Sequence, residues 1–153
     1  LLQYRLRGTT SLGGRRARGL RRIFVNTENS KKSRTRVAVV EDEAFIVESL
    51  RFLLERNGME VTAYTSGTAA LSHIEPATQP DVIILDLMIP GVDGMTVLQK
   101  FRGERNISAK IIVLTANGQD AERERALAAG ADLFITKPYS NQDLIDKVAS
   151  LAP

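Results

Sequence analysis

Five short apolar segments alternate with five segments of helical character after residue 36, and this alternation constrains the fold most strongly. The apolar segments are 37–40, 59–64, 81–86, 109–116 and 132–136, and the helical segments are 44–58, 67–76, 94–103, 119–130 and 140–151. Apolar runs that are continuous, rather than interrupted by polar residues, are typical of parallel strands buried on both faces. Right-handed crossovers then predict an α/β fold, a doubly wound five-stranded parallel sheet with helices on both faces.

The helical segments carry recognisable faces and ends. The residues expected to point inward are Ile46, Leu50, Leu53 and Leu54 in the first segment and Met95, Leu98 and Phe101 in the third. Gly58 occupies a position that ends a helix, and Ser140 stands three residues before Asp143, the spacing of a helix-capping pair. Segment 119–130 has only one large apolar residue, Leu127, so we expect it to be weakly anchored.

The charge of the chain is divided unevenly. Residues 1–36 contain eleven Lys and Arg but one acid, whereas the remaining residues contain ten Lys and Arg and seventeen Asp and Glu. We therefore expect a basic, mostly disordered N-terminal arm over residues 1–35 and a folded domain over residues 36–153. The arm also fits an organelle transit peptide, an upstream extension or a solvated tail. Its charge would attract polyanions, but no recognition helix or aromatic platform accompanies it, so we expect no specific nucleic acid binding.

The amino-acid composition limits the cellular environments that we expect for this protein. The sequence contains no cysteine, which excludes disulfides and thiolate metal sites and fits a reducing environment. No apolar stretch approaches the ~20 residues of a membrane span. We expect a cytoplasmic protein, not associated with membranes, that is a monomer or weak dimer. Because little sequence follows the last strand, it is interpreted as a stand-alone domain or a fragment of a longer protein. The single histidine, His73, is interpreted as an exposed surface residue.

Chemically active side chains stand at the carboxyl ends of four of the five predicted strands. Glu41 and Asp42 follow the first strand, and Asp86 ends the third. Thr115 ends the fourth strand, and Lys137 ends the fifth. In parallel sheets of this kind, ligands bind outside the carboxyl ends of the strands. We therefore expect these five side chains to line one pocket.

The charges of this pocket do not balance. Three carboxylates face one ammonium group, and close carboxylates do not all stay ionised unless a further positive charge joins them. A small set of oxygen ligands favours Mg²⁺, which keeps several of its waters. An Asp carboxylate can accept a phosphoryl group, and Mg²⁺, a lysine and a hydroxyl can neutralise the transferred oxygens. The residues therefore predict a Mg²⁺-dependent phosphoryl acceptor.

Four motifs together resemble the receiver domain of two-component response regulators, in particular stand-alone receivers of the chemotaxis type. They are VVEDE at 39–43, ILDLMIPGVDG at 84–94, VLTA at 113–116 and FITKPY at 134–139. Each motif is weak alone, but four in the right order and spacing are specific, and the likeness covers about residues 36–151. It implies a flavodoxin-like sheet of strand order 2-1-3-4-5. It also implies a chain that catalyses only its own phosphorylation and dephosphorylation and is otherwise not an enzyme.

The resemblance implies a role for each site residue. Asp86 would accept the phosphoryl group from a histidine kinase or a histidine phosphotransfer protein. Thr115 and Lys137 would bind the phosphoryl oxygens. The expected Mg²⁺ ligands are Glu41, Asp42, Asp86 and the backbone carbonyl of Met88.

The resemblance also implies a switch and an output face. Phe134 takes the place of the family's switch aromatic and acts with Thr115, although Phe lacks the hydroxyl of the Tyr found in other members. On phosphorylation its ring is expected to turn inward. The expected docking face for a downstream protein is formed by segments 119–130, 132–136 and 140–151. A cis bond is expected before Pro138, as tight turns use.

Two other classes of protein share parts of this pattern. A phosphohydrolase of the haloacid-dehalogenase type also combines Asp, Lys, Thr and Mg²⁺, but it needs an acid two residues after the nucleophile, where this chain has Met88. A nucleotide-binding domain needs a Gly-rich phosphate loop after its first strand, and none is present. Turnover of small phosphate esters would favour the first of these alternatives.

Overall fold

The described part of the chain, residues 33–153 of a computed structural model, alternates strands and helices throughout. The elements are β1 (Arg36–Val40), α1 (Ala44–Arg56), β2 (Glu60–Tyr64), α2 (Gly67–His73), β3 (Val82–Leu85), α3 (Gly94–Gln99), the π-helical turn η1 (Lys100–Glu104), β4 (Lys110–Thr115), α4 (Asp120–Ala128), β5 (Leu133–Thr136) and α5 (Asn141–Leu151). All strand pairs are parallel, and the strand order is β2-β1-β3-β4-β5. The predicted doubly wound sheet and its order are therefore confirmed.

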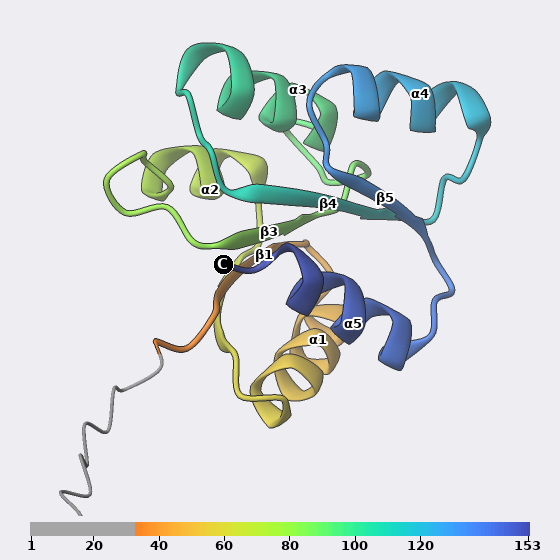
Figure 1. The fold of residues 1–153 in the computed structure, drawn as a ribbon. Coiled ribbons are helices and arrows are strands. Elements are labelled where there is room, and N and C mark those ends of the chain that lie inside the picture. Colours follow the sequence, from red (N-terminus) through yellow and green to blue (C-terminus); the bar gives the residue numbers. More distant parts are fainter. Residues whose placement is uncertain (1–32) are drawn as a thin grey trace, which may run out of the picture. The chain divides into compact units, whose positions relative to one another are not determined.

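The sheet is the middle layer of three (Figure 1). Helices α1 and α5 cover one face, and α2, α3 and α4 cover the other. The register pairs Val40 with Leu85 and Leu85 with Val113, so that β1, β3 and β4 reach their carboxyl ends side by side. One further backbone bond, from Asp86 N to Val40 O at 3.0 Å, continues the β1–β3 ladder past the end of β3. This bond places Asp86 beside the first residues of the loop after β1.

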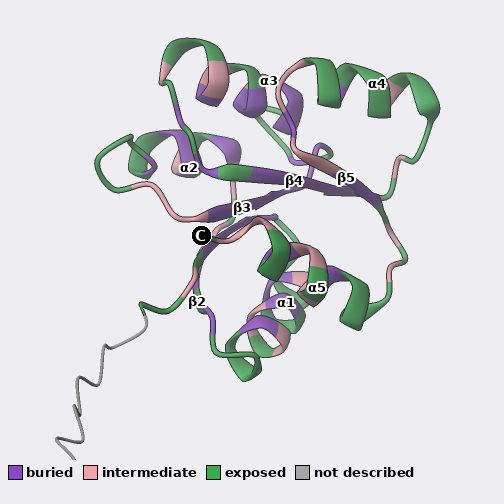
Figure 2. Cartoon of the chain, in the orientation of Figure 1, coloured by how far each residue is buried: buried purple, intermediate pink, exposed green. Residues whose placement is uncertain are grey.

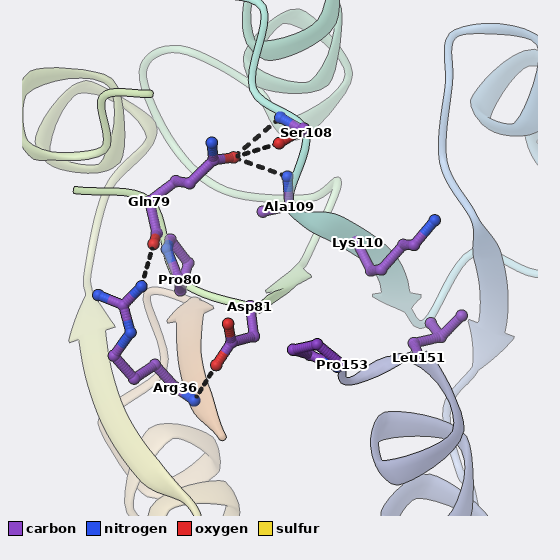
Figure 3. Close-up of a pocket in the computed structure, with 9 residues that line it drawn as sticks. All are labelled: Arg36, Gln79, Pro80, Asp81, Ser108, Ala109, Lys110, Leu151 and Pro153. Carbon is purple, nitrogen blue, oxygen red and sulfur yellow. Dashed lines mark hydrogen bonds between the residues drawn. The ribbon is translucent and has the colours of Figure 1, made fainter. Parts of the chain in front are cut away.

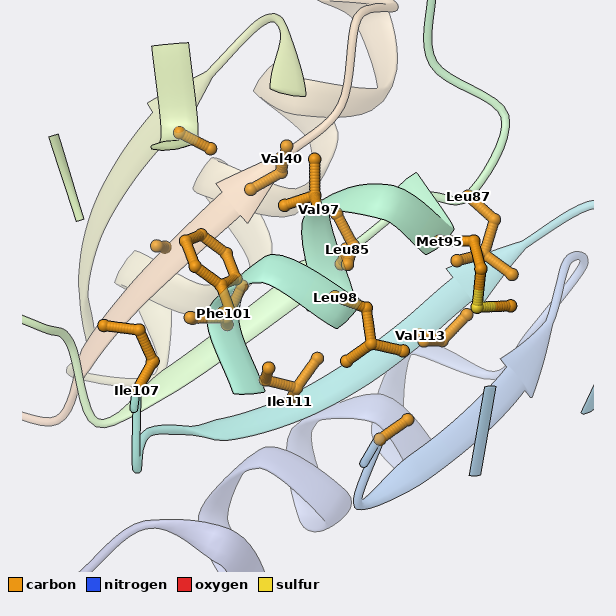
Figure 4. Close-up of a cluster of buried hydrophobic side chains, with 14 of the residues drawn as sticks. Val40, Leu85, Leu87, Met95, Val97, Leu98, Phe101, Ile107, Ile111 and Val113 are labelled. Carbon is orange, nitrogen blue, oxygen red and sulfur yellow. The ribbon is translucent and has the colours of Figure 1, made fainter. Parts of the chain in front are cut away.

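Each face of the sheet has its own apolar core, which explains why the strands are apolar at consecutive positions (Figure 2). Ile83 and Leu85 of β3 pack toward α2 and α3, whereas Val82 and Ile84 pack toward α1 and α5. In Figure 4 the ring of Phe101 lies with side chains of α3, β3 and β4 in the first of these cores. The expected inward residues Met95, Leu98 and Phe101 are all buried there.

Two helices differ from expectation in their packing or extent. The inward residues of α1 are Val47, Leu50 and Leu54, while Ile46 and Leu53 are only partly buried. The predicted face left out Val47 and included Ile46 and Leu53, because the residues that pack on the sheet follow i, i+3, i+7 spacing from Val47. The expected helix 94–103 is divided, since α3 gives way to η1, whose wider turn is closed by a bond from Arg105 N to Lys100 O at 3.0 Å.

Several local predictions are confirmed. Gly58 follows α1 with φ of +80°, and Ser140 Oγ accepts from Asp143 N at 3.4 Å at the start of α5. The Lys137–Pro138 bond is cis, and His73 is exposed. No helix among the residues that the structure describes is long and apolar enough to cross a membrane. The prediction of a disordered arm falls on residues 1–32, which lie outside the described residues, and it stays a prediction.

Candidate functional site

The carboxyl edge of the sheet gathers the polar side chains that the sequence singles out. Within residues 33–153, the buried polar or charged residues are Glu41, Asp86 and Thr115, and all three were predicted site residues. They follow or end β1, β3 and β4, three neighbouring strands. Burial of two carboxylates costs free energy unless they are paired with a positive charge, so Glu41 and Asp86 need such a partner at this edge.

Lys137 pairs with both carboxylates. Its Nζ donates to Glu41 Oε2 at 2.8 Å and to Asp86 Oδ2 at 3.0 Å. Its backbone N donates to Thr115 O at 2.8 Å, which fixes the end of β5 against the end of β4. Burial alone would lower the pKa of Lys137, but the hydrogen bonds to Glu41 and Asp86 and their charges outweigh it and raise that pKa above 10.5. Lys137 is therefore fully charged at neutral pH.

The second oxygen of each carboxylate accepts from the backbone. Glu41 Oε1 accepts from Glu43 N at 3.1 Å, and Asp86 Oδ1 accepts from Met88 N at 2.9 Å. Burial raises the pKa of Glu41 above 4.5, because it outweighs the lowering by the Lys137 and Glu43 hydrogen bonds. Both oxygens of Asp86 are thus oriented, one by a fixed amide and one by a side chain that can move.

The other two expected metal ligands lie at the rim of this cluster. Asp42 is exposed, and so is the side chain of Met88, whose expected contribution is its backbone carbonyl. Among residues 33–153 no three acidic or histidine side chains converge closely enough to form a metal site by themselves. Lys137 contacts both Glu41 and Asp86, so two of the expected ligands are already paired with an ammonium group. The Mg²⁺ ligand set stays a prediction.

Thr115 and Phe134 both lie inside the protein. Thr115 Oγ1 accepts from Asn117 N at 3.4 Å, which is a long bond, and because the oxygen is the acceptor this bond does not use the hydroxyl hydrogen. Phe134 is 6% exposed, and the guanidinium of Arg123 on α4 lies 5.7 Å from the centroid of its ring. We expected this ring to turn inward on phosphorylation, but it is already inside in this structure, so the inward turn has no exposed starting point here.

Gly94, at the start of α3, approaches the backbone of Asp86 more closely than any side chain would allow. A Cβ at this position would lie 2.1 Å from Asp86 O. Asp93 caps the same helix, since its Oδ1 accepts from Thr96 N at 3.0 Å, and this bond is the main reason why the pKa of Asp93 is lowered below 3.8. An Asp before an apolar helical segment is an N-terminal capping signal, so this cap was open to prediction from the sequence.

A hollow of about 400 Å³ lies at the opposite edge of the sheet (Figure 3). It is lined by Arg36, Gln79, Pro80, Asp81, Ser108, Ala109, Lys110, Leu151 and Pro153. None of the predicted site residues is among them. Gln79 Oε1 accepts from Ser108 N at 2.8 Å and from Ala109 N at 2.7 Å, so this side chain joins the loop before β3 to the loop before β4.

Comparison with known proteins agrees with the geometry. Residues 37–149 match the family described as "Response regulator receiver domain". The chain is 37% identical over 117 residues to the sensory transduction protein RegX3 of Mycobacterium tuberculosis (76% of this chain, 50% of that protein). It is 38% identical over 120 residues to the phosphate regulon transcriptional regulatory protein PhoB of Escherichia coli (76% and 51%). It therefore spans about half the length of the curated relatives it matches.

Solved structures agree in fold as well. The receiver domain of the Francisella response regulator 1452 has a TM-score of 0.72 and 32% identity, covering 76% of this chain and 95% of that one. A CheY-like response regulator receiver domain protein from Methanospirillum hungatei has a TM-score of 0.71 and 29% identity, covering 77% and 93%. The resemblance inferred from four motifs is confirmed: this chain belongs to the response regulator receiver domain family of two-component signalling systems.

Proposed function

We propose that this chain is a phosphoacceptor signalling module in which Asp86 receives a phosphoryl group from a histidine kinase or a histidine phosphotransfer protein. The observation that carries the proposal is the pairing of Lys137 with both Asp86 and Glu41 at the carboxyl edge of the sheet. A buried carboxylate held on one oxygen by a backbone amide and on the other by a lysine has a defined direction of attack.

The transfer exchanges one bond for another. A carboxylate oxygen of Asp86 attacks phosphorus, the bond from phosphorus to the imidazole nitrogen of the donor breaks, and the electron pair stays on the imidazole. Lys137 is already within hydrogen-bond distance of the attacking group and turns its charge toward the phosphoryl oxygens. Thr115 contributes its free hydroxyl hydrogen on the other side. The same residues serve the later hydrolysis, in which water attacks phosphorus, the bond from phosphorus to the Asp86 oxygen breaks, and the carboxylate is restored as inorganic phosphate leaves.

The donor set of the site fits Mg²⁺. Every candidate ligand is an oxygen: the carboxylates of Glu41, Asp42 and Asp86 and the carbonyl of Met88. Few oxygen ligands at an open rim suit a small cation that keeps its waters. The ion would supply the positive charge that Lys137 alone does not, and would neutralise the phosphoryl oxygens. Occupancy requires Lys137 to release at least one carboxylate, so we expect weak binding without a phosphoryl group.

The output is proposed to be a downstream protein that docks on the face made by α4, β5 and α5. RegX3 and PhoB are named as a sensory transduction and a transcriptional regulatory protein, respectively, so control of transcription is one output of such a receiver. This chain matches only about half of each of them, and its own output lies with whichever partner recognises this face.

Phosphorylation by a small donor tests the proposal. The chain is incubated with acetyl phosphate and Mg²⁺, and its intact mass is measured. One added phosphoryl group is expected, and Asp86→Asn should abolish it. Asp81→Asn is the matched control, because Asp81 precedes the same strand at its other end and should leave phosphorylation unchanged. A full mass shift in Asp86→Asn would reject the proposal.

The metal is tested separately. Titration with Mg²⁺ should show binding in the wild type that is lost in Asp42→Asn, while the same substitution at Asp146, exposed on α5, should have no effect. Equal affinity of Asp42→Asn and the wild type would remove Asp42 from the ligand set.

A further inference from the structure

Helix α4 is held to the body by very little apolar surface. Its single buried residue is Ala126, and its one large apolar side chain, Leu127, is 41% exposed. The weak anchoring expected from the sequence is therefore more pronounced in the structure, because Leu127 does not serve as an anchor. A helix with so little buried surface depends more on the contacts at its two ends. The hydrogen bonds made by side chains are shorter at the C-terminal end of α4 than at its N-terminal end.

The C-terminal end is held by Arg102 of the π-helical turn η1. The side chain of Arg102 donates from Nε to Gly130 O and from one terminal nitrogen to Ala109 O, each at 2.9 Å, and also to Ile107 O. Its other terminal nitrogen donates to Asp132 Oδ2 at 2.9 Å. One partly buried guanidinium thus joins the loop after α4 to the segment before β4. Gly130 packs on it directly, since a Cβ there would lie 2.7 Å from Arg102 Cγ.

At the N-terminal end the hydrogen bonds made by side chains are all long, although Gly118 packs closely on the side chain of Thr136. The capping residue Gln119 makes no side-chain bond to the helix. The loop before it is held by the bond from Asn117 N to Thr115 Oγ1 at 3.4 Å and the bond from Gln119 N to Asn117 Oδ1 at 3.3 Å. The amide of Asn117 reaches Glu122 only at 3.5 Å. These bonds lead directly from the buried hydroxyl of Thr115 to the first turn of α4.

We propose that Arg102 is the pivot of α4, about which the helix rotates when Thr115 turns toward a phosphoryl group on Asp86. The proposal rests on the proposed function and concerns the regulation of the same site. Thr115 gives up its long bond with Asn117, the loop follows, and the N-terminal end of α4 moves while the Arg102 contact keeps the C-terminal end in place. Arg123, in the first half of α4, moves with this end of the helix and therefore shifts relative to the ring of Phe134.

The identity of residue 102 matters for this role. A guanidinium presents several donors in a fixed plane and can bind three carbonyls and a carboxylate together, which a lysine ammonium cannot. The irregular geometry of η1 brings this side chain to the loop after α4, and π-helical turns are frequent at functional positions. Removal of the guanidinium should free the C-terminal end of α4 as well, so that the helix shifts as a whole when Thr115 releases the N-terminal end.

Distances between spin labels measure the two ends of α4 separately. The chain has no cysteine, so pairs of cysteines can be introduced without background. One label is placed at Ala121 or at Ala128, both exposed on α4, and the other at Glu48 on α1 or at Ser72 on α2. Two reference positions detect a movement that one of them alone would miss. Distances are recorded with and without beryllofluoride and Mg²⁺, and fluorine NMR reports whether the mimic is bound.

A rotation about Gly130 predicts the ratio of the two shifts. Ala121 lies about 13 Å and Ala128 about 3 Å along the helix from this point, so the shift at Ala121 should be roughly fourfold larger. In Arg102→Lys the two shifts should become similar. Gln79→Ala is the matched control, because Gln79 makes a comparable set of bonds to the segment before β4 but does not touch the loop after α4. It should keep the wild-type ratio.

Every outcome decides between the alternatives. Similar shifts at both ends in the wild type, an unchanged ratio in Arg102→Lys, or no shift with the mimic bound would each overturn the pivot and leave Asp86 as an acceptor. Failure of the mimic to bind would overturn the proposed function together with the pivot. Should Arg102→Lys melt too early for measurement, Asp132→Asn removes the charge that orients Arg102 and should also lower the ratio.

Discussion

Replacement of Lys137 by Met should destabilise the domain at neutral pH and should do so less in acid. Lys137 Nζ lies 2.8 Å from Glu41 Oε2 and 3.0 Å from Asp86 Oδ2. Each contact corresponds to about 6 kcal/mol of attraction at an effective dielectric constant of about 20. The loss of hydration offsets much of this, at several kcal/mol per buried ion.

The net loss in the free energy of unfolding depends on the two carboxylates that lose their partner when Lys137 is replaced. Removal of one partner of a buried ion pair typically costs about 3–5 kcal/mol, because the remaining charge is unpaired. Here two carboxylates remain, but each keeps a backbone donor, Glu43 N or Met88 N. We therefore expect a loss of about 3 kcal/mol in the free energy of unfolding at pH 7. The raised pKa of Lys137 means that its stabilising effect is complete below pH 10.5, so pH 7 reports all of it.

Acid should reverse part of the loss. Glu41 already has a pKa raised above 4.5 by burial, and removal of the ammonium raises it further. A carboxyl group whose folded-state pKa is raised destabilises the fold at higher pH, and that penalty disappears as pH falls through the raised value toward 4.5. The difference between Lys137→Met and the wild type should therefore shrink as pH falls from 7 toward 4.5. Added Mg²⁺ should also stabilise the variant more than the wild type.

Urea unfolding at several pH values measures these differences. Lys147→Met is the control, because Lys147 pairs with Asp143 on the exposed side of α5 and should cost no more than about 0.5 kcal/mol. A loss for Lys137→Met equal to that control, or one that does not change with pH, would refute the electrostatic reasoning.

Three further predictions concern the helix cap, the core and the arm. Asp93→Ala should cost about 1 kcal/mol at pH 7 through loss of the cap of α3, and Asp93→Asn should largely avoid this loss. Because the pKa of Asp93 is lowered, the part of the difference that depends on its charge should be lost as pH falls through that pKa, below 3.8. Phe101→Ala, at a position 0% exposed, should cost about 3–5 kcal/mol in urea unfolding, whereas Phe52→Ala, at a position 64% exposed, should cost under about 1 kcal/mol. A chain starting at Ser33 should melt and accept phosphoryl groups like the full chain, and a large drop in its melting temperature would show that the arm stabilises the domain.

The sheet was predictable from the sequence because a strand that is buried on both faces has apolar residues at consecutive positions. The segment 81–86 is apolar at consecutive positions, and in the structure Val82 and Ile84 face one core while Ile83 and Leu85 face the other. Strand order was not predictable from periodicity and came from the family resemblance. The division of helix 94–103 at Lys100 was missed, since a π-helical turn has no separate signal in the pattern of apolar residues.

The sequence predicted which residues belong to the site better than it predicted how exposed or buried each of them is. Charged residues at strand ends pointed to one edge, and the structure brings Glu41, Asp86 and Lys137 into contact there. The exposed position of Asp42 and the buried position of Phe134 were not foreseen, because both depend on loop geometry and on Arg123 lying over the ring. Arg102 was missed altogether, since its acceptors are backbone carbonyls, which the sequence does not distinguish.

The close approach of Gly94 to Asp86 has a consequence for mutational scanning. Any side chain at position 94 would have to displace either the first turn of α3 or the carbonyl of Asp86, which lies 2.1 Å from where a Cβ would be. Either displacement misaligns the carboxylate with Lys137. In a library of all single substitutions selected for phosphorylation, glycine should therefore be retained at position 94 nearly as strictly as aspartate at position 86, although only one of them meets the phosphoryl group. The residues that phosphorylation requires therefore include positions, such as Gly94, that do not touch the phosphoryl group.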